Sequence, residues 1–224
     1  MTDLSITQEY VICSVDGKGK ISGFSIEKMV CFVAAGILEL QMEGCIALEG
    51  KHVSVTSELP FSMQYLKPLY DFINHECIRC KKEIKLNKIL EAYHISLTDK
   101  RYRELLDSVG ASLVDKGLAQ ESQVGLLGSK KGYVPAPEAI RSVVEGLRAE
   151  LLEEGKVAEE TAALVILLEK AKCLKQYFSK FEQKEMKKRL RNMMDSPDGK
   201  LVKAMVDHVE TLLAVLCVSA SGTV

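Results

Sequence analysis

The segment NHECIRCKKE, residues 74–83, places three potential metal ligands within six residues: His75, Cys77 and Cys80. Two cysteines separated by two residues supply half of a zinc site, or the two thiols of a redox motif. A structural zinc needs four ligands, and the chain has neither a second Cys-x-x-Cys nor a histidine pair at zinc-finger spacing. A thioredoxin-like motif would lie between a strand and a helix, whereas this one lies between two predicted helices. We therefore expect a loop with two ordinary thiols, and no metal.

A second candidate for a metal site is SVDGKGKIS, residues 14–22, which has the glycine of a calcium-binding loop. If Gly19 takes the turn position, Lys18 falls where an oxygen ligand is required and Ser25 where the bidentate glutamate belongs. We expect an ordinary turn. The sequence also lacks the G-x-S-x-G elbow, the Walker phosphate loop and the H-E-x-x-H motif. It thus predicts no enzyme, no catalytic residue and no cofactor.

The composition is that of a folded, water-soluble protein. Hydrophobic residues make up 47% of the 224 residues, charged residues 27%, and the net charge is −1. This balance gives no overall attraction to nucleic acid or anionic lipid, so such binding needs a local basic patch. The odd number of scattered cysteines favours a reduced, cytoplasmic protein. The longest apolar run, MVCFVAAGIL, is shorter than the ~20 residues that span a bilayer.

Most of the chain has helical periodicity. We expect a buried helix that is capped by Ser25 and ended by Gly44, because its apolar residues leave little polar face. Alternating patterns predict two hairpins, at 45–56 and at about 118–134. The other expected helices cover residues 6–15, 68–73, 84–93, 99–113, 139–152, 161–178, 183–194 and 201–219. The predicted fold is mainly α: one domain over residues 1–224, with central apolar helices wrapped by amphipathic ones and two short β-hairpins.

The segment KEMKKRLRNMM, residues 184–194, is the strongest basic cluster. On a helix its apolar face holds Met186, Leu190 and Met193, and its basic residues Lys184, Lys187, Lys188 and Arg191 lie largely off that face. The simplest interpretation is a solvated face above a packed stripe. A helix followed by a hairpin with a basic tip also fits a winged-helix nucleic-acid binder. The neutral net charge and the lack of a basic recognition helix argue against nucleic acid as a partner.

Five blocks in order resemble one known family. They are LSITQEYVICSVDGKGKI, AAGILELQMEGCIALEG, LVDKGLAQESQVGLLGSKKGYVP, TAALVILLEKAKCLKQYF, and EMKKRLRNMM with the closing HVETLLAVLCVSA. Their succession, from about residue 4 to residue 220, is similar to that of the Golgi phosphoprotein 3 family. The resemblance implies a non-enzymatic adaptor, peripheral on a cytosolic membrane face, that binds phosphatidylinositol 4-phosphate, an anionic phospholipid, and protein partners.

The resemblance also suggests site residues. In the family a protruding hairpin serves self-association and membrane contact; its apolar strand matches VGLL here, which implies a homo-oligomer with Leu126 and Leu127 at the contact. The family's lipid pocket combines a tryptophan before the buried helix, an arginine within it and two arginines on a later helix. Phe24 is the aromatic residue nearest to the tryptophan position, and Arg103 matches one arginine.

At the other two arginine positions this chain has Val33 and Leu106, with Lys28 and Arg101 as candidate replacements. We therefore expect weak, salt-sensitive binding to anionic vesicles without strong head-group preference. A self-associating scaffold of the same fold without lipid binding is the alternative within the family, and a winged-helix-like nucleic-acid binder is the alternative outside it.

Overall fold

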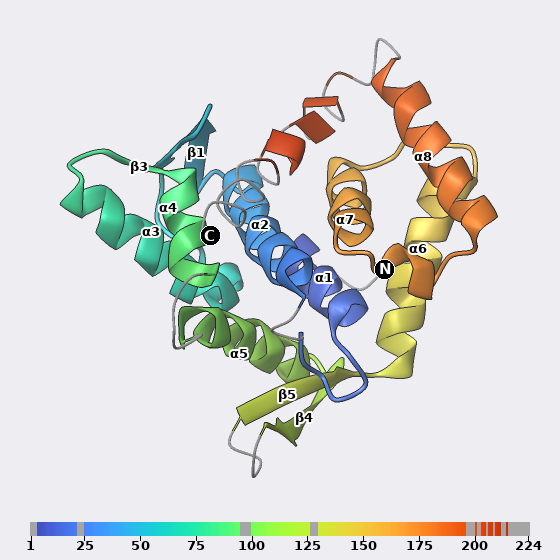
Figure 1. Cartoon of the computed structure of the whole chain (residues 1–224), viewed down its shortest axis with the longest axis horizontal. Coiled ribbons are helices and arrows are strands. Elements are labelled where there is room, and N and C mark those ends of the chain that lie inside the picture. Colours follow the sequence, from blue (N-terminus) through green and yellow to red (C-terminus); the bar gives the residue numbers. More distant parts are fainter. Residues whose placement is uncertain are drawn as a thin grey trace, which may run out of the picture.

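The computed structural model describes residues 4–21, 25–94, 100–125 and 130–195, together with 200, 203, 204, 206, 207, 209–211 and 214 (Figure 1). Within this part the chain is mainly helical, with two small antiparallel sheets. The predicted fold class is therefore confirmed. No described helix is long and apolar enough to span a membrane.

The α-helices are α1 (Ile6–Ser14), α2 (Ile26–Met42), α3 (Lys67–Arg79), α4 (Leu86–His94), α5 (Lys100–Asp115), α6 (Pro137–Leu152), α7 (Glu159–Lys170) and α8 (Lys180–Met194). Two 3₁₀ helices are η1 (Phe61–Leu66) and η3 (Leu174–Gln176). The strands are β1 (Ile46–Glu49), β2 (His52–Val55), β3 (Glu83–Lys85), β4 (Ala119–Val124) and β5 (Lys130–Pro135). The described residues from 203 to 214 are helical, within the last helix that the sequence predicts.

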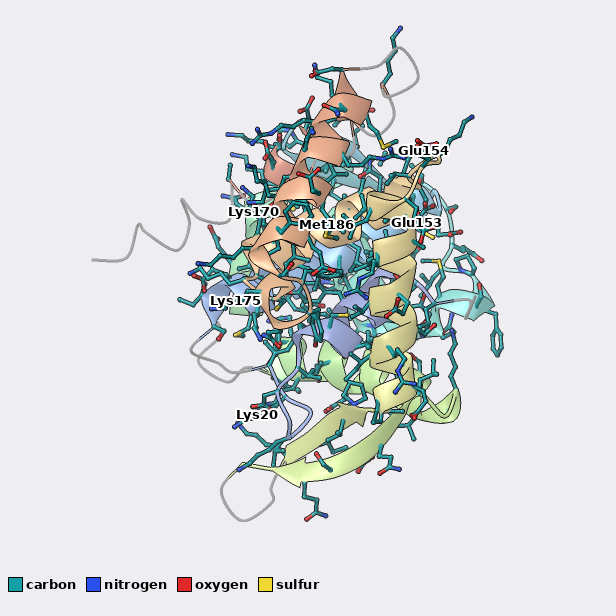
Figure 2. All side chains as sticks on the ribbon, turned by 90° about the vertical axis from the view of Figure 1, so that its right-hand side faces the viewer. Lys20, Glu153, Glu154, Lys170, Lys175 and Met186 are labelled. Atoms are coloured by element: carbon teal, nitrogen blue, oxygen red, sulfur yellow. The ribbon has the colours of Figure 1, made fainter. Side chains whose placement is uncertain are left out.

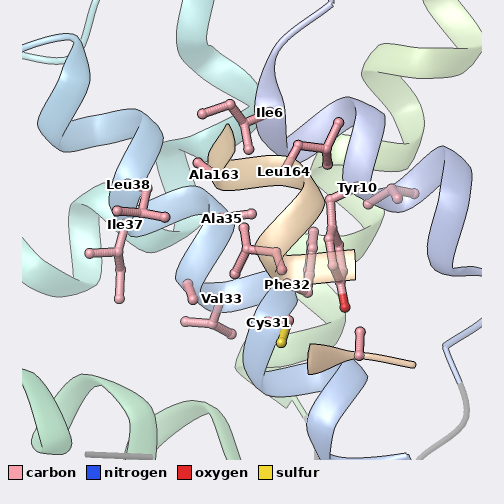
Figure 3. Close-up of a cluster of buried hydrophobic side chains, with 14 of the residues drawn as sticks. Ile6, Tyr10, Cys31, Phe32, Val33, Ala35, Ile37, Leu38, Ala163 and Leu164 are labelled. Carbon is pink, nitrogen blue, oxygen red and sulfur yellow. The ribbon is translucent and has the colours of Figure 1, made fainter. Parts of the chain in front are cut away.

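Helix α2 is the centre of the core, as predicted. Its twelve consecutive residues from Met29 to Leu40 are all buried. Helices α1 and α7 pack against it, and Figure 3 shows Tyr10 of α1 beside Phe32 of α2, with Leu164 of α7 near Tyr10. A helix that is apolar on every side must be covered on every side, so segments from both halves of the chain surround it. The prediction of one domain over 1–224 stays a prediction.

Glycines end the two helices that precede the hairpins. Gly44 and Gly117 have φ values of +70° and +71°, which side chains with a Cβ rarely adopt. The same hydrogen bond closes both helix ends. The N–H of Cys45 donates to the Leu40 carbonyl oxygen, and the N–H of Leu118 donates to the Leu113 carbonyl oxygen. The predicted cap glycine at position 44 is confirmed, and Gly117 closes α5 in the same way. Ser25, by contrast, makes no side-chain cap hydrogen bond to α2.

Four predicted elements differ from the structure. The first hairpin, β1–β2, gains a third strand, because Ile84 of β3 pairs with Val53 and both side chains are buried. The helix expected from residue 84 therefore begins at residue 86. Helix α3 is longer than 68–73 and includes Cys77. The helix expected over 161–178 ends at Lys170, because Lys172 takes a left-handed φ of 59° and closes the helix as a glycine would.

The second predicted hairpin is confirmed as β4–β5, which packs against α5 at the lower edge of Figure 1. Two contacts hold Tyr133 of β5: its N–H donates to the Gly19 carbonyl oxygen at 2.7 Å, and its hydroxyl donates to Asp107 of α5 at 3.1 Å. The Tyr133 ring covers Gly110, where a side chain would overlap it. The hairpin is thus fixed to α5 and to the turn after α1.

We predict that Gly110→Ala destabilises the protein by about 1–3 kcal/mol, because the new methyl group displaces the Tyr133 ring and loosens the hairpin. Gly146→Ala is the matched control, since Gly146 also lies in a helix but has open space where its Cβ would be. That control should be neutral or more stable by up to about 1 kcal/mol. Urea unfolding measures both; equal midpoints for the two variants would contradict the prediction.

Candidate functional site

Arg103 is the only predicted lipid-site residue that the structure describes. It is half-buried on α5, one helical turn before Asp107. Its Nε is buried and has no hydrogen-bond acceptor in the described part of the chain. Buried donors are nearly always paired, because an unpaired one loses its hydration without compensation. An anionic oxygen that binds here would supply the missing acceptor.

Arg103 belongs to a charged group that links α5 to the hairpin. Burial raises the pKa of Asp107 above its ordinary value. The hydrogen bond from Tyr133 and the positive charges of Arg103 and Lys131 partly oppose this rise. Lys131 in turn pairs with Glu121 across the hairpin, with Nζ and Oε2 2.9 Å apart. Ligand binding at Arg103 would therefore act directly on the junction between α5 and the hairpin.

The two positions where the family pattern has further arginines are closed by apolar packing. Val33 is 2% exposed and Leu106 is 4% exposed. Val33 lines a void of about 10 Å³ together with apolar side chains of α2 and α4 and with Tyr93. A space of this size cannot hold a lipid head group.

The two candidate replacements have contacts of their own. Lys28 donates from Nζ to the Ser14 carbonyl oxygen at 2.8 Å. The Arg101 guanidinium lies 5.0 Å from the centre of the Phe72 ring. Phe24, Leu126 and Leu127 lie outside the described residues. The structure thus brings no second predicted cation to Arg103.

A group of lysines that the sequence analysis missed lies on one side of the molecule. Lys172 pairs with Glu27, with Nζ and Oε1 2.6 Å apart, and this hydrogen bond lowers the pKa of Glu27. In Figure 2, Lys20, Lys170 and Lys175 lie along one side of the molecule, opposite Glu153 and Glu154. We call these three residues the lysine face. Lys172 and Glu27 are 145 residues apart, so no local pattern could have revealed their contact.

A pocket beside α1 has the opposite charge. It holds about 400 Å³ between α1, the end of α2 and η1, and its lining includes Glu9, Glu39, Glu43 and Glu160. Glu39 is buried and accepts hydrogen bonds from the Thr7 N–H at 3.0 Å and from the Tyr65 hydroxyl. Burial, helped by nearby glutamates, raises the pKa of Glu9 to about 7. These carboxyl groups would repel a phosphate, so this pocket does not suit an anionic lipid.

The cysteine motif forms the end of α3 and is not a loop. Cys77 is buried and donates to the Val53 carbonyl oxygen at 3.5 Å, whereas Cys80 is exposed. The charged centre of the motif is Glu76, whose Oε2 lies 2.7 Å from Arg79 and 2.6 Å from Lys88 of α4. Among the described residues, no three or more His, Cys, Asp or Glu side chains are arranged to hold a metal ion. The motif therefore links α3 to α4 through the ion pair between Glu76 and Lys88.

The comparison with protein families agrees with this architecture. The model of one family, Golgi phosphoprotein 3 (GPP34), matches residues 6–210 of the chain. The match includes α1 to α8 and both sheets. No curated protein matches the chain.

We predict that Glu76→Gln lowers stability at neutral pH. Hydrogen bonds from Lys88 and Arg79 lower the pKa of Glu76 from 4.5 to about 2. The ionised carboxylate therefore contributes stability above pH 4.5 that is lost as the pH falls toward 2. Urea unfolding should show the variant less stable than wild type at pH 7 and equally stable near pH 2. Glu91→Gln, at an exposed position of α4, is the control; an equal loss there would contradict this account.

Proposed function

The chain belongs to the Golgi phosphoprotein 3 family, and from this premise we propose that it is a non-enzymatic peripheral membrane adaptor that binds anionic phospholipid head groups. Arg103 is the central lipid-binding residue of this proposal, with Phe24 beside it by family resemblance. The membrane side includes the β4–β5 hairpin and the lysine face. The protein acts on a cytosolic membrane face and carries protein partners there, as an adaptor does.

The buried Nε of Arg103 is the observation that carries the proposal. A guanidinium binds phosphate through charge-assisted hydrogen bonds, which are stronger than neutral ones. Asp107 lies within reach of the Arg103 charge, but in the described structure its hydrogen bond comes from Tyr133. A phosphate oxygen would therefore give the Arg103 Nε the hydrogen-bond acceptor that the described part of the fold does not provide.

The same geometry supports charge-driven rather than head-group-selective binding. Phosphatidylinositol 4-phosphate is the family's lipid, and its selective recognition needs several cations that converge on one head group. Val33 and Leu106 occupy two of those positions and are buried. The lysine face supplies further positive charge, and Ile26 at the start of α2 is 41% exposed and apolar. Lysines near a surface add about 1 kcal/mol each to binding at an anionic membrane, whatever the head group.

Self-association is the second part of the proposal. The turn after α1 partly occupies the outer edge of β5, where the Tyr133 N–H donates to Gly19, while β4 has one edge without a strand partner in the described structure. Such edges accept a strand from another copy. Leu126 and Leu127 come two and three residues after Val124, the last residue of β4. We propose that these two leucines supply the apolar contact with a second copy or with the bilayer, as the family resemblance implies.

We predict that Arg103→Ala weakens flotation with phosphatidylserine vesicles at low salt about 5-fold, which corresponds to about 1 kcal/mol for one basic residue near the surface. Arg141→Ala, at an exposed position of α6, is the control and should change little. Replacing phosphatidylserine with phosphatidylinositol 4-phosphate at equal charge should not strengthen binding of the wild type. Head-group-selective binding that survives physiological salt would contradict the charge-driven account, and a DNA mobility shift without vesicle binding would contradict lipid binding itself.

We predict that wild-type protein forms an oligomer whose mass rises with concentration and that Leu126→Ser with Leu127→Ser returns it to a monomer. The reason is that the variant removes the apolar contact at the hairpin and leaves the β4–β5 pairing intact. Phe61→Ser with Ile78→Ser removes two other exposed apolar side chains, 94% and 71% exposed, and should leave the mass unchanged. Light scattering measures all three; a wild type that stays monomeric would refute the idea.

A further inference from the structure

Helix α8 has a buried apolar face and an exposed basic face. It contains six basic and two acidic residues, while Met186 and Leu190 are buried against the core. Lys180, Lys184, Lys188 and Arg191 are exposed on the opposite side. These four residues, together with other polar residues of α8, line one surface groove of about 650 Å³. We call the four residues the α8 stripe.

Most of the charge of the α8 stripe is not neutralised within the described structure. Lys188 is the member with an ion pair there, to Glu185 at a distance of 4.0 Å. The half-buried Lys187 beside the stripe pairs with Glu169 of α7 at 2.6 Å. A solvated face of a helix usually mixes both signs of charge, whereas the groove along α8 is lined by five basic residues and one acidic residue, Asp195. Its field therefore points outward and favours an anionic partner.

Phe181 adds an apolar group at the edge of the α8 stripe. Its side chain is 72% exposed, although an aromatic ring of this size is normally buried. On a helix it neighbours Lys184, three residues later, and it lies on the same side as Lys188, seven residues later. An exposed aromatic side chain beside several lysines is the composition of helices that lie at a membrane surface.

The α8 stripe is continuous with the lysine face. Lys170 of that face, Lys187 and Arg191 line the same depression between α7 and α8, together with Glu210 and Glu169, which pair with Lys170 and Lys187. Lys175 lies in η3, which packs against α8. Both basic surfaces are therefore parts of one side of the molecule, the side that carries Lys20, Lys170 and Lys175 in Figure 2.

We infer that the α8 stripe and Phe181 form a second membrane-contact surface, which binds an anionic bilayer through several head groups at once. This inference rests on the proposed function. The stripe runs from residue 180 to residue 191 of one helix, a length of about 16 Å at 1.5 Å per residue. Its charges thus lie in a line on an outer face, as a flat anionic surface requires. Nucleic-acid recognition by stacking would need several aromatic residues beside the stripe, whereas we identify one, Phe181.

The test compares two variants that each remove three positive charges. Lys180→Gln, Lys184→Gln and Lys188→Gln act on the α8 stripe. Lys51→Gln, Lys82→Gln and Lys85→Gln are the control, at exposed positions of the three-stranded sheet, on the other side of the molecule from α8 in Figure 1. With phosphatidylserine vesicles at low salt we expect the α8 variant to bind about 10- to 100-fold more weakly than the control. Circular dichroism checks that both variants keep their helices.

A fluorescent reporter tests the contact directly, because the chain contains no tryptophan. Phe181→Trp places a single indole at the edge of the α8 stripe, and Phe61→Trp places one at a 94% exposed position on η1. Adding anionic vesicles should shift the emission of Trp at position 181 to shorter wavelength and expose it to quenching by brominated lipids. The reporter at position 61 should not respond.

The outcomes separate this inference from the proposed function. A wild type that binds no anionic vesicle overturns both. A wild type that binds, with an α8 variant of equal affinity or an unresponsive reporter at position 181, overturns the second surface alone. Equal weakening by both triple variants also overturns it, because only net charge would then matter. Binding to RNA or to polyglutamate, lost in the α8 variant without any vesicle binding, would assign the stripe to a different partner.

Discussion

The burial of α2 is the constraint on which the rest of the structure depends. Its twelve consecutive buried residues, Met29 to Leu40, require cover on all sides, and a chain of this length provides it by wrapping α1 and α7 around them. The same constraint acts on recognition. A guanidinium at position 33 would have to leave water inside an apolar environment, which is unfavourable without a paired charge. Valine at that position favours the core and gives up a cation that a head group could use.

Positive charge consequently lies on the outside of the fold rather than in a pocket. Lysines on a surface interact over several ångströms with any anionic layer, and salt weakens that interaction. Arg103 is different, because its Nε is buried beside Asp107 at the junction with the hairpin. In the proposed function, one buried guanidinium would fix where a phosphate binds, while the exposed lysines would determine how strongly the surface as a whole is attracted. Selectivity and affinity thus depend on different residues.

Local patterns predicted much of this fold. The apolar run of α2, the glycines at 44 and 117 and the hairpin that contains Tyr133 all carry short-range signals. Strand β3 was missed because three residues show no period, and only pairing of Ile84 with Val53 makes them a strand. The end of α7 was missed because a lysine takes the left-handed position where glycine would be the signal. For the candidate site, Arg103 could be predicted only from the resemblance to the family. The contact of Lys172 with Glu27 depends on tertiary packing and has no local signature.

Two contacts on one rigid body explain how weak sites can suffice for an adaptor. If Arg103 and the hairpin bind the same membrane as the α8 stripe, the second contact no longer requires a separate encounter. The affinities then multiply, although each contact alone is modest. A second copy joined through the hairpin would multiply them again. Such a protein responds steeply to the charge density of the membrane and only slightly to the identity of one head group, since many lysines and one pocket arginine share the work.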